Sequence, residues 1–123
     1  MMRVLITGIA GFTGSRLAEW ILAHVPGCEV WGVDDLSCGY PESVPDGVDW
    51  TCLQLGVADP KVAMLFAQPI DYVFHLAAYA AEGLSPFIRS YNYRNNLLAT
   101  AELLTVAIEA GNVRRFVFAS SMA

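Results

Sequence analysis

The chain has 123 residues, of which 55% are apolar and only 15% are charged, so we expect one small, densely buried domain. Its net charge is −5 and its seven Lys and Arg residues form no cluster, which argues against nucleic-acid binding. No apolar run is as long as a membrane span and no signal peptide precedes the first strand, so we expect a cytoplasmic protein without a membrane partner.

The chain begins with an apolar segment, residues 2–7, that is typical of a buried strand. Gly8, Gly11 and Gly14 follow this strand and open a helix predicted at 12–24. The first glycine permits a tight turn, the second lets a ligand approach the backbone, and the third lets the helix pack closely on the strand. The start of the helix presents unpaired N–H groups and a partial positive charge. These features predict a site for the pyrophosphate of a dinucleotide.

The second predicted strand, residues 29–34, ends in the acidic pair Asp34 and Asp35. A carboxylate about twenty positions after the glycines can accept hydrogen bonds from both hydroxyls of a ribose. The same carboxylate would repel the additional phosphate of NADP, so the sequence favours NAD. The alternative is an ordinary strand–turn–helix unit followed by a solvated acidic pair. We favour the dinucleotide site because strand, glycines, helix and acid occur together in the required order.

Strands and helices continue to alternate after this unit. Further strands are predicted at 49–54, 71–75 and 114–119, and further helices at 60–67 and 86–110. Alternation of this kind predicts an α/β fold, a Rossmann-type doubly wound parallel sheet that forms one domain over residues 1–123. Ligands of such sheets bind at the carboxyl ends of the strands, so the loops that follow the strands should line one crevice.

The cysteine and histidine residues do not form a recognisable reactive centre. Cys28, Cys38 and Cys52 are odd in number and lack the spacing of metal ligands, which predicts reduced thiols and no metal site. His75 ends a predicted buried strand, where a structural hydrogen bond is a better interpretation than a catalytic base.

Taken together, these segments resemble the extended short-chain dehydrogenase/reductase family, in particular its NAD-dependent epimerases and dehydratases of nucleotide sugars. The resemblance rests on five ordered blocks, residues 7–15, 33–37, 75–78, 96–100 and 115–121. It implies that the chain is the amino-terminal, NAD-binding portion of an enzyme that removes a hydride from a sugar carbon and later returns it. A carboxyl-terminal substrate domain is expected to lie outside this chain, and the substrate of the complete enzyme would be a nucleotide sugar.

The resemblance also implies roles for individual residues. Phe12 and Thr13 would donate backbone N–H groups to the pyrophosphate, and Asp34 would hold the adenosine ribose. The other implied contacts are Asp35 and Leu36 beside the adenine, Gly56 and Val57 along its wall, and Leu76, Ala77, Ala78, Tyr79 and Asn96 near the diphosphate and nicotinamide ribose. Ser121 matches the catalytic Ser/Thr of the family, whose hydroxyl bonds the reacting oxygen of the substrate.

Besides the unusual segment Ala80-Ala81-Glu82-Gly83, the sequence departs from the family pattern at two places that concern the cofactor and the proton transfer. Gly56 stands where the family usually has Asp, so the contact to the adenine amino group would be lost or moved to the backbone. The family's Tyr-x-x-x-Lys pair, which would transfer the proton, does not occur in this chain, where Lys61 is the only lysine. We therefore expect this chain to be inactive by itself.

Two alternatives stay open from the sequence. The chain could be a non-catalytic dinucleotide-binding module, or part of a family reductase that acts on a small carbonyl compound. A fifth strand at the edge of the sheet would leave Phe116, Val117 and Phe118 partly uncovered, and the helix at 86–110 carries an apolar face. An uncovered apolar edge or helix face predicts a homo-oligomer.

Overall fold

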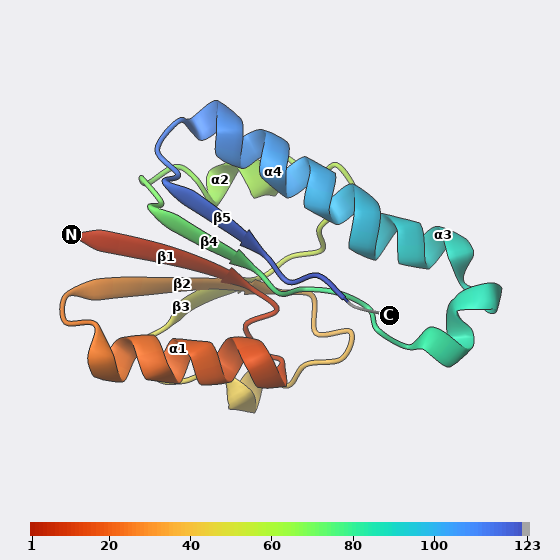
Figure 1. The fold of residues 1–123 in the computed structure, drawn as a ribbon, viewed down its shortest axis with the longest axis horizontal. Helices are drawn as coiled ribbons and strands as arrows, with labels where there is room; N and C mark the ends of the chain where they lie inside the picture. The colour runs from red at the N-terminus through yellow and green to blue at the C-terminus, as the bar shows by residue number, and fades with distance from the viewer. Residues whose placement is uncertain (122–123) are drawn as a thin grey trace.

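A computed structural model describes residues 1–121 and shows one five-stranded sheet (Figure 1). Its strands are β1 (Met2–Thr7), β2 (Cys28–Asp34), β3 (Asp49–Cys52), β4 (Tyr72–His75) and β5 (Arg115–Phe118). They are all parallel, in the order β3-β2-β1-β4-β5. The chain thus builds outward from β1 in one direction and then, with β4, in the other. This arrangement confirms the Rossmann-type α/β fold and puts the change of direction between β1 and β4.

The pairing of the central strand sets the position of the site. β1 pairs with β2 as far as Thr7 opposite Val33, and with β4 as far as Thr7 opposite His75. These three residues therefore lie side by side at the carboxyl edge of the sheet. Every loop that follows them starts at the same level, which is the edge where parallel α/β sheets bind ligands.

Helices cover both faces of the sheet, as a doubly wound fold requires (Figure 1). The α-helices are α1 (Phe12–His24), α2 (Lys61–Met64), α3 (Arg89–Asn92) and α4 (Ala99–Ala110). Shorter or wider turns form η1 (Pro41–Ser43), η2 (Glu82–Phe87) and the π-helical η3 (Tyr93–Leu98). α1 lies on one face, and α2 and α4 lie on the other.

The core consists of two apolar clusters, one on each face of the sheet. Leu5 packs in the cluster that contains residues of α2 and α4, whereas Val4 and Ile6 pack in the cluster that contains Ala18 and Ile21 of α1. Successive side chains of a strand point to opposite faces, so β1 serves both clusters. All three of these β1 side chains are at most 3% exposed, which makes β1 the fixed centre of the domain.

The structure corrects two of the predicted helices. The helix expected at 60–67 is α-helical only over Lys61–Met64, and the next residues form tighter turns in which the Phe66 N–H bonds the Ala63 carbonyl. The continuous helix expected at 86–110 is wrong at its start. Pro86 lies in the 3₁₀ turn η2, and Ile88 has a non-helical backbone (φ −128°, ψ 39°), so the α-helical conformation begins only at Arg89.

Residues 1–121 contain neither a membrane-spanning helix nor a cluster of metal ligands. No helix there combines the length and hydrophobicity needed to cross a bilayer. The same residues contain no group of three His, Cys, Asp or Glu side chains that could hold a metal ion.

Candidate functional site

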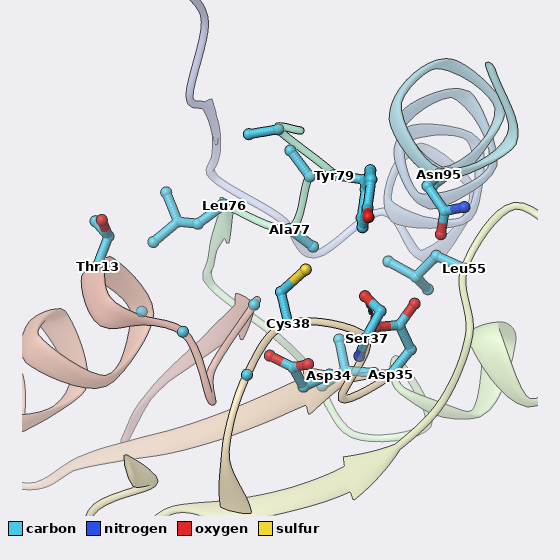
Figure 2. Close-up of a pocket in the computed structure, with 18 of the residues that line it drawn as sticks. Thr13, Asp34, Asp35, Ser37, Cys38, Leu55, Leu76, Ala77, Tyr79 and Asn95 are labelled. Atoms are coloured by element: carbon cyan, nitrogen blue, oxygen red, sulfur yellow. Dashed lines mark hydrogen bonds between the residues drawn. The ribbon is translucent and has the colours of Figure 1, made fainter. Parts of the chain in front are cut away.

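A pocket of about 400 Å³ opens at the carboxyl ends of the strands (Figure 2). Its walls come from the turn after β1, the loops after β2 and β3, the segment after β4, and the helix that ends in α4. The predicted cofactor residues that line it are Gly8, Gly11, Phe12, Thr13, Gly14, Asp34, Asp35, Leu76, Ala77, Ala78 and Tyr79. Segments far apart in the sequence are thus brought into one cavity at the predicted edge of the sheet.

Four of the predicted cofactor residues lie beside this pocket and not in its lining. Leu36, Gly56, Val57 and Asn96 are absent from the described lining, although their chain neighbours Asp35, Leu55 and Asn95 belong to it. Ser121, the predicted catalytic residue, is exposed, follows β5, and is likewise outside the described lining.

The glycine turn brings the helix start very close to the end of β1. Gly8 has a φ of +73°, which favours glycine, and its N–H donates to the Val33 carbonyl with an N···O distance of 2.8 Å. A Cβ on Gly14 would lie only 2.1 Å from the Gly8 carbonyl oxygen. Gly14 therefore has the packing role predicted for it, because any side chain there would push α1 away from the turn.

The first turn of α1 is chemically suited to an anion. Gly11 is its N-cap residue, no side chain caps it, and its first turn contains no acidic residue. The backbone N–H groups of Phe12, Thr13 and Gly14 have no acceptor within the helix, since the first intrahelical bond runs from Ser15 to the Gly11 carbonyl. The partial positive charge of the helix end adds to these donors. Phosphate oxygens would accept hydrogen bonds from these N–H groups, and their negative charge would be stabilised by the positive end of the helix.

Asp34 is held in a fixed orientation at the end of β2. Its Oδ2 accepts the Ala10 N–H at 3.0 Å, and its Oδ1 accepts the Leu36 N–H at 2.8 Å. The carboxylate therefore ties the turn after β1 to the loop after β2. Each carboxylate oxygen can accept a further hydrogen bond, so Asp34 offers the pocket two pre-oriented acceptors.

Sequence reasoning missed several residues of the lining. These are Val33, Ser37, Cys38, Gly39, Leu53, Leu55, Ala80, Asn95 and Ala99. Ser37, Cys38 and Gly39 directly follow the acidic pair, so the expectation that loops after strands line the crevice could have identified them. Gly39 lies against the turn that follows β1, because a Cβ on Gly39 would be 2.8 Å from the Ala10 carbonyl carbon.

His75 has the structural hydrogen bonds predicted for it. The side chain is 1% exposed, and its two ring nitrogens lie 2.7 Å from Thr7 Oγ1 and 2.9 Å from Thr100 Oγ1. Burial lowers its pKa from 6.5 to about 4, since a charged ring would lose its hydration there. His75 is therefore neutral at physiological pH, held between two hydroxyl groups.

This lowered pKa predicts a specific loss of stability in acid. Between pH 6.5 and 4 the unfolded chain binds a proton at His75 that the folded chain excludes, so the stability present above pH 6.5 is lost as the pH falls. We expect the free energy of unfolding to fall by about 3 kcal/mol from this residue over that range. Urea denaturation of the wild-type chain and of His75→Asn at several pH values measures it. Parallel pH profiles for the two proteins would contradict the assignment.

The comparison with known proteins agrees with this geometry. The model of the NAD dependent epimerase/dehydratase family matches residues 4–123. The chain belongs to this family. The UDP-glucose 4-epimerase of Mycolicibacterium smegmatis is 35% identical over an alignment of 124 positions, which covers 98% of this chain and 39% of that protein.

Solved structures of the epimerase/dehydratase family share the fold. The Thermus thermophilus UDP-glucose 4-epimerase in complex with NAD is 37% identical, with a TM-score of 0.80, over 90% of this chain and 35% of its own. The Thermotoga maritima UDP-glucose 4-epimerase with UDP-glucose is 30% identical, with a TM-score of 0.90, over 98% of this chain and 38% of its own. The chain thus spans less than two fifths of these relatives and matches their amino-terminal, NAD-binding region.

The structure explains why this member of the epimerase/dehydratase family has glycine at position 56. Gly56 has a φ of +80°, and a Cβ there would lie 2.1 Å from the Arg94 carbonyl oxygen. An Asp side chain is therefore excluded in this conformation. The Gly56 N–H instead donates to Oε2 of Glu102 at 2.6 Å, which fixes the loop after β3 against α4.

Proposed function

We propose that this chain holds NAD in the pocket at the carboxyl edge of the sheet, as the cofactor-binding part of a nucleotide-sugar epimerase or dehydratase. The observation that carries the proposal is the uncapped start of α1, which faces the same pocket as the braced Asp34 carboxylate. Anion-binding donors and a diol-binding acceptor in one cavity match the two ends of an adenosine diphosphate group.

The protein's contribution is to bind and orient. In this proposal the N–H groups of Phe12 and Thr13 bind the pyrophosphate, and Asp34 accepts both hydroxyls of the adenosine ribose. The adenine lies beside Asp35 and Leu36, with Gly56 and Val57 along its wall. The nicotinamide half passes Leu76, Ala77, Ala78, Tyr79 and the neighbourhood of Asn96. Bound NAD supplies the hydride acceptor for a sugar carbon.

The substrate and the proton transfer belong to the complete protein in this proposal. A nucleotide sugar is the proposed substrate, and the Ser121 hydroxyl would hydrogen-bond its reacting oxygen. Because these 123 residues contain no Tyr-x-x-x-Lys pair, we expect this chain to bind NAD but not to catalyse the conversion of a substrate. The free thiols of Cys28, Cys38 and Cys52 support a reducing, cytoplasmic environment.

Self-association is part of the same proposal. Leu97 near the end of η3, and Leu104 and Ile108 in α4, are exposed apolar residues spaced seven and four positions apart. This is the spacing of an apolar seam between paired helices, while Phe118 is exposed on the edge strand β5. Sedimentation at micromolar concentrations should show a dimer or larger species, and a strictly monomeric chain would refute this part.

Cys38 offers a chemical test of the proposed cofactor site. It is exposed and lines the pocket, whereas Cys52 is exposed but lies outside the described lining (Figure 2). NAD at ten times its Kd should slow the alkylation of Cys38 by iodoacetamide about tenfold, because reaction requires the free pocket. The alkylation of Cys52 should not change. Mass spectrometry of the two peptides gives both rates, and equal rates at Cys38 with and without millimolar NAD would refute the site.

A further inference from the structure

His75 connects three elements that meet at the carboxyl edge of the sheet. It is the last residue of β4, and its ring lies between Thr7, the last residue of β1, and Thr100 in the first turn of α4. The distances are 2.7 Å from Nδ1 to Thr7 Oγ1 and 2.9 Å from Nε2 to Thr100 Oγ1. Neither contact needs a charge on the ring, which is buried between the three elements.

The contacts of Thr7 decide the tautomer of the ring. The Thr7 hydroxyl oxygen accepts the N–H groups of Leu76 at 3.1 Å and Ala77 at 3.0 Å. A hydroxyl group has two lone pairs and one hydrogen, so these two bonds use its acceptor capacity. Its hydrogen must then be donated to His75 Nδ1. The ring is therefore neutral, with its own hydrogen on Nε2.

The other side of the ring continues the same chain of hydrogen bonds. His75 Nε2–H donates to Thr100 Oγ1, and the Thr100 hydroxyl donates to the Asn96 carbonyl at 2.6 Å. The Asn96 side chain in turn forms two hydrogen bonds with the backbone of Tyr79. It accepts the Tyr79 N–H at 2.8 Å and donates to the Tyr79 carbonyl at 3.0 Å. Both polar atoms of the Asn96 side chain are thus bonded to the segment after β4.

The network fixes both ends of one wall of the pocket. Thr7 holds Leu76 and Ala77 at the start of segment 76–79, and Asn96 holds Tyr79 at its end. All of this segment lines the pocket (Figure 2).

We propose that His75 is a positioning residue for the dinucleotide pocket, whose neutral ring sets segment 76–79 and the start of α4 in the positions that form this wall. Because the ligand is the one proposed above, this role rests on the proposed function. Protonation of Nδ1 would place an N–H group against the Thr7 oxygen, whose two lone pairs already accept the N–H groups of Leu76 and Ala77. The bond between His75 and Thr7 would then be lost, and segment 76–79 would no longer be held in this position. Among the described residues, the hydrogen-bond and ring contacts of His75 are with Thr7 of β1, Thr100 of α4, and the Phe116 and Phe118 rings of β5, none of which is charged.

The decisive comparison uses three variants of the full chain. Thr100→Val removes the acceptor of Nε2–H and should weaken NAD binding about fivefold to tenfold by calorimetry, with faster hydrogen exchange of the Leu76 and Ala77 amides. Thr100→Ser keeps the hydroxyl and should restore both. Thr105→Val is the control, because the Thr105 hydroxyl also donates to a carbonyl one turn earlier but is exposed and away from His75.

The outcomes separate the inference from the proposed function. No NAD binding by the wild-type chain would refute the proposed function. The positioning role would be overturned if folded Thr100→Val had the NAD affinity and amide exchange of the wild-type chain. It would also be overturned if Thr100→Ser were as impaired in both as Thr100→Val. If Thr100→Val does not fold, the long-range ¹H–¹⁵N NMR spectrum of wild-type His75 still decides. We expect the neutral ring with hydrogen on Nε2 at pH 7, and a hydrogen on Nδ1 would overturn the inference.

Discussion

Replacing Gly14 with Ala is expected to destabilise the chain by about 3 kcal/mol, although alanine normally stabilises a helix relative to glycine by about 1 kcal/mol. The reason is the added Cβ, which would lie 2.1 Å from the Gly8 carbonyl oxygen. That oxygen belongs to the backbone, so α1 itself must move away from the turn. The same movement would carry its first N–H groups out of the pocket and abolish NAD binding.

Urea denaturation of Gly14→Ala and Gly83→Ala measures the effect against a matched control. In the part of the chain that the structure describes, no residue other than the chain neighbours of Gly83 has an atom within 4 Å of a Cβ placed there, and Gly83 is not among the glycines with positive φ. Its replacement should therefore be neutral or slightly stabilising. A Gly14→Ala chain as stable as Gly83→Ala would show that the helix start is not packed against the turn as described.

Replacing Asp34 with Ala is expected to weaken NAD binding about 10- to 100-fold. The carboxylate is the proposed acceptor for the ribose hydroxyls, and hydrogen bonds to a charged group contribute about 1.5 to 3 kcal/mol. The substitution also frees the Ala10 and Leu36 N–H groups that Asp34 now holds. Isothermal titration calorimetry with NAD measures the affinity.

The control for this substitution is Asp46→Ala, which removes the same charge from a residue outside the described lining of the pocket. Its affinity for NAD should equal that of the wild-type chain. Circular dichroism establishes that all three proteins are folded at the temperature of the titration. Unchanged affinity in folded Asp34→Ala would remove the ribose assignment.

The sheet and the glycine turn could be predicted from the sequence because their signals are local. The strand that ends at Thr7, the helix over 12–24 and the position of Asp34 all follow from hydrophobic patterns and residue types within a few positions. The hydrophobic pattern also gave the order of strands and helices along the chain. The observed register, in which β1, β2 and β4 end at the same level, agrees with the expectation that the loops after the strands line one crevice.

Other features depend on contacts between distant segments and have no local signal. The Glu102 bond to the Gly56 N–H joins a loop to a helix 46 positions away. The start of the long predicted helix is a different case, because Pro86 and the non-helical Ile88 interrupt the apolar pattern locally and the pattern alone did not mark where the helix begins. The two bonds between Asn96 and Tyr79 could not be predicted either, because the residue type of Asn96 does not show which distant backbone groups it will contact.

A titration of the ¹⁵N-labelled chain with NAD, followed residue by residue by NMR, identifies the backbone amides that contact the cofactor. If the uncapped start of α1 binds the pyrophosphate, the amide signals of Phe12, Thr13 and Gly14 should shift most, together with those around Asp34. Saturable shifts confined to other residues, with these amides unmoved, would contradict it.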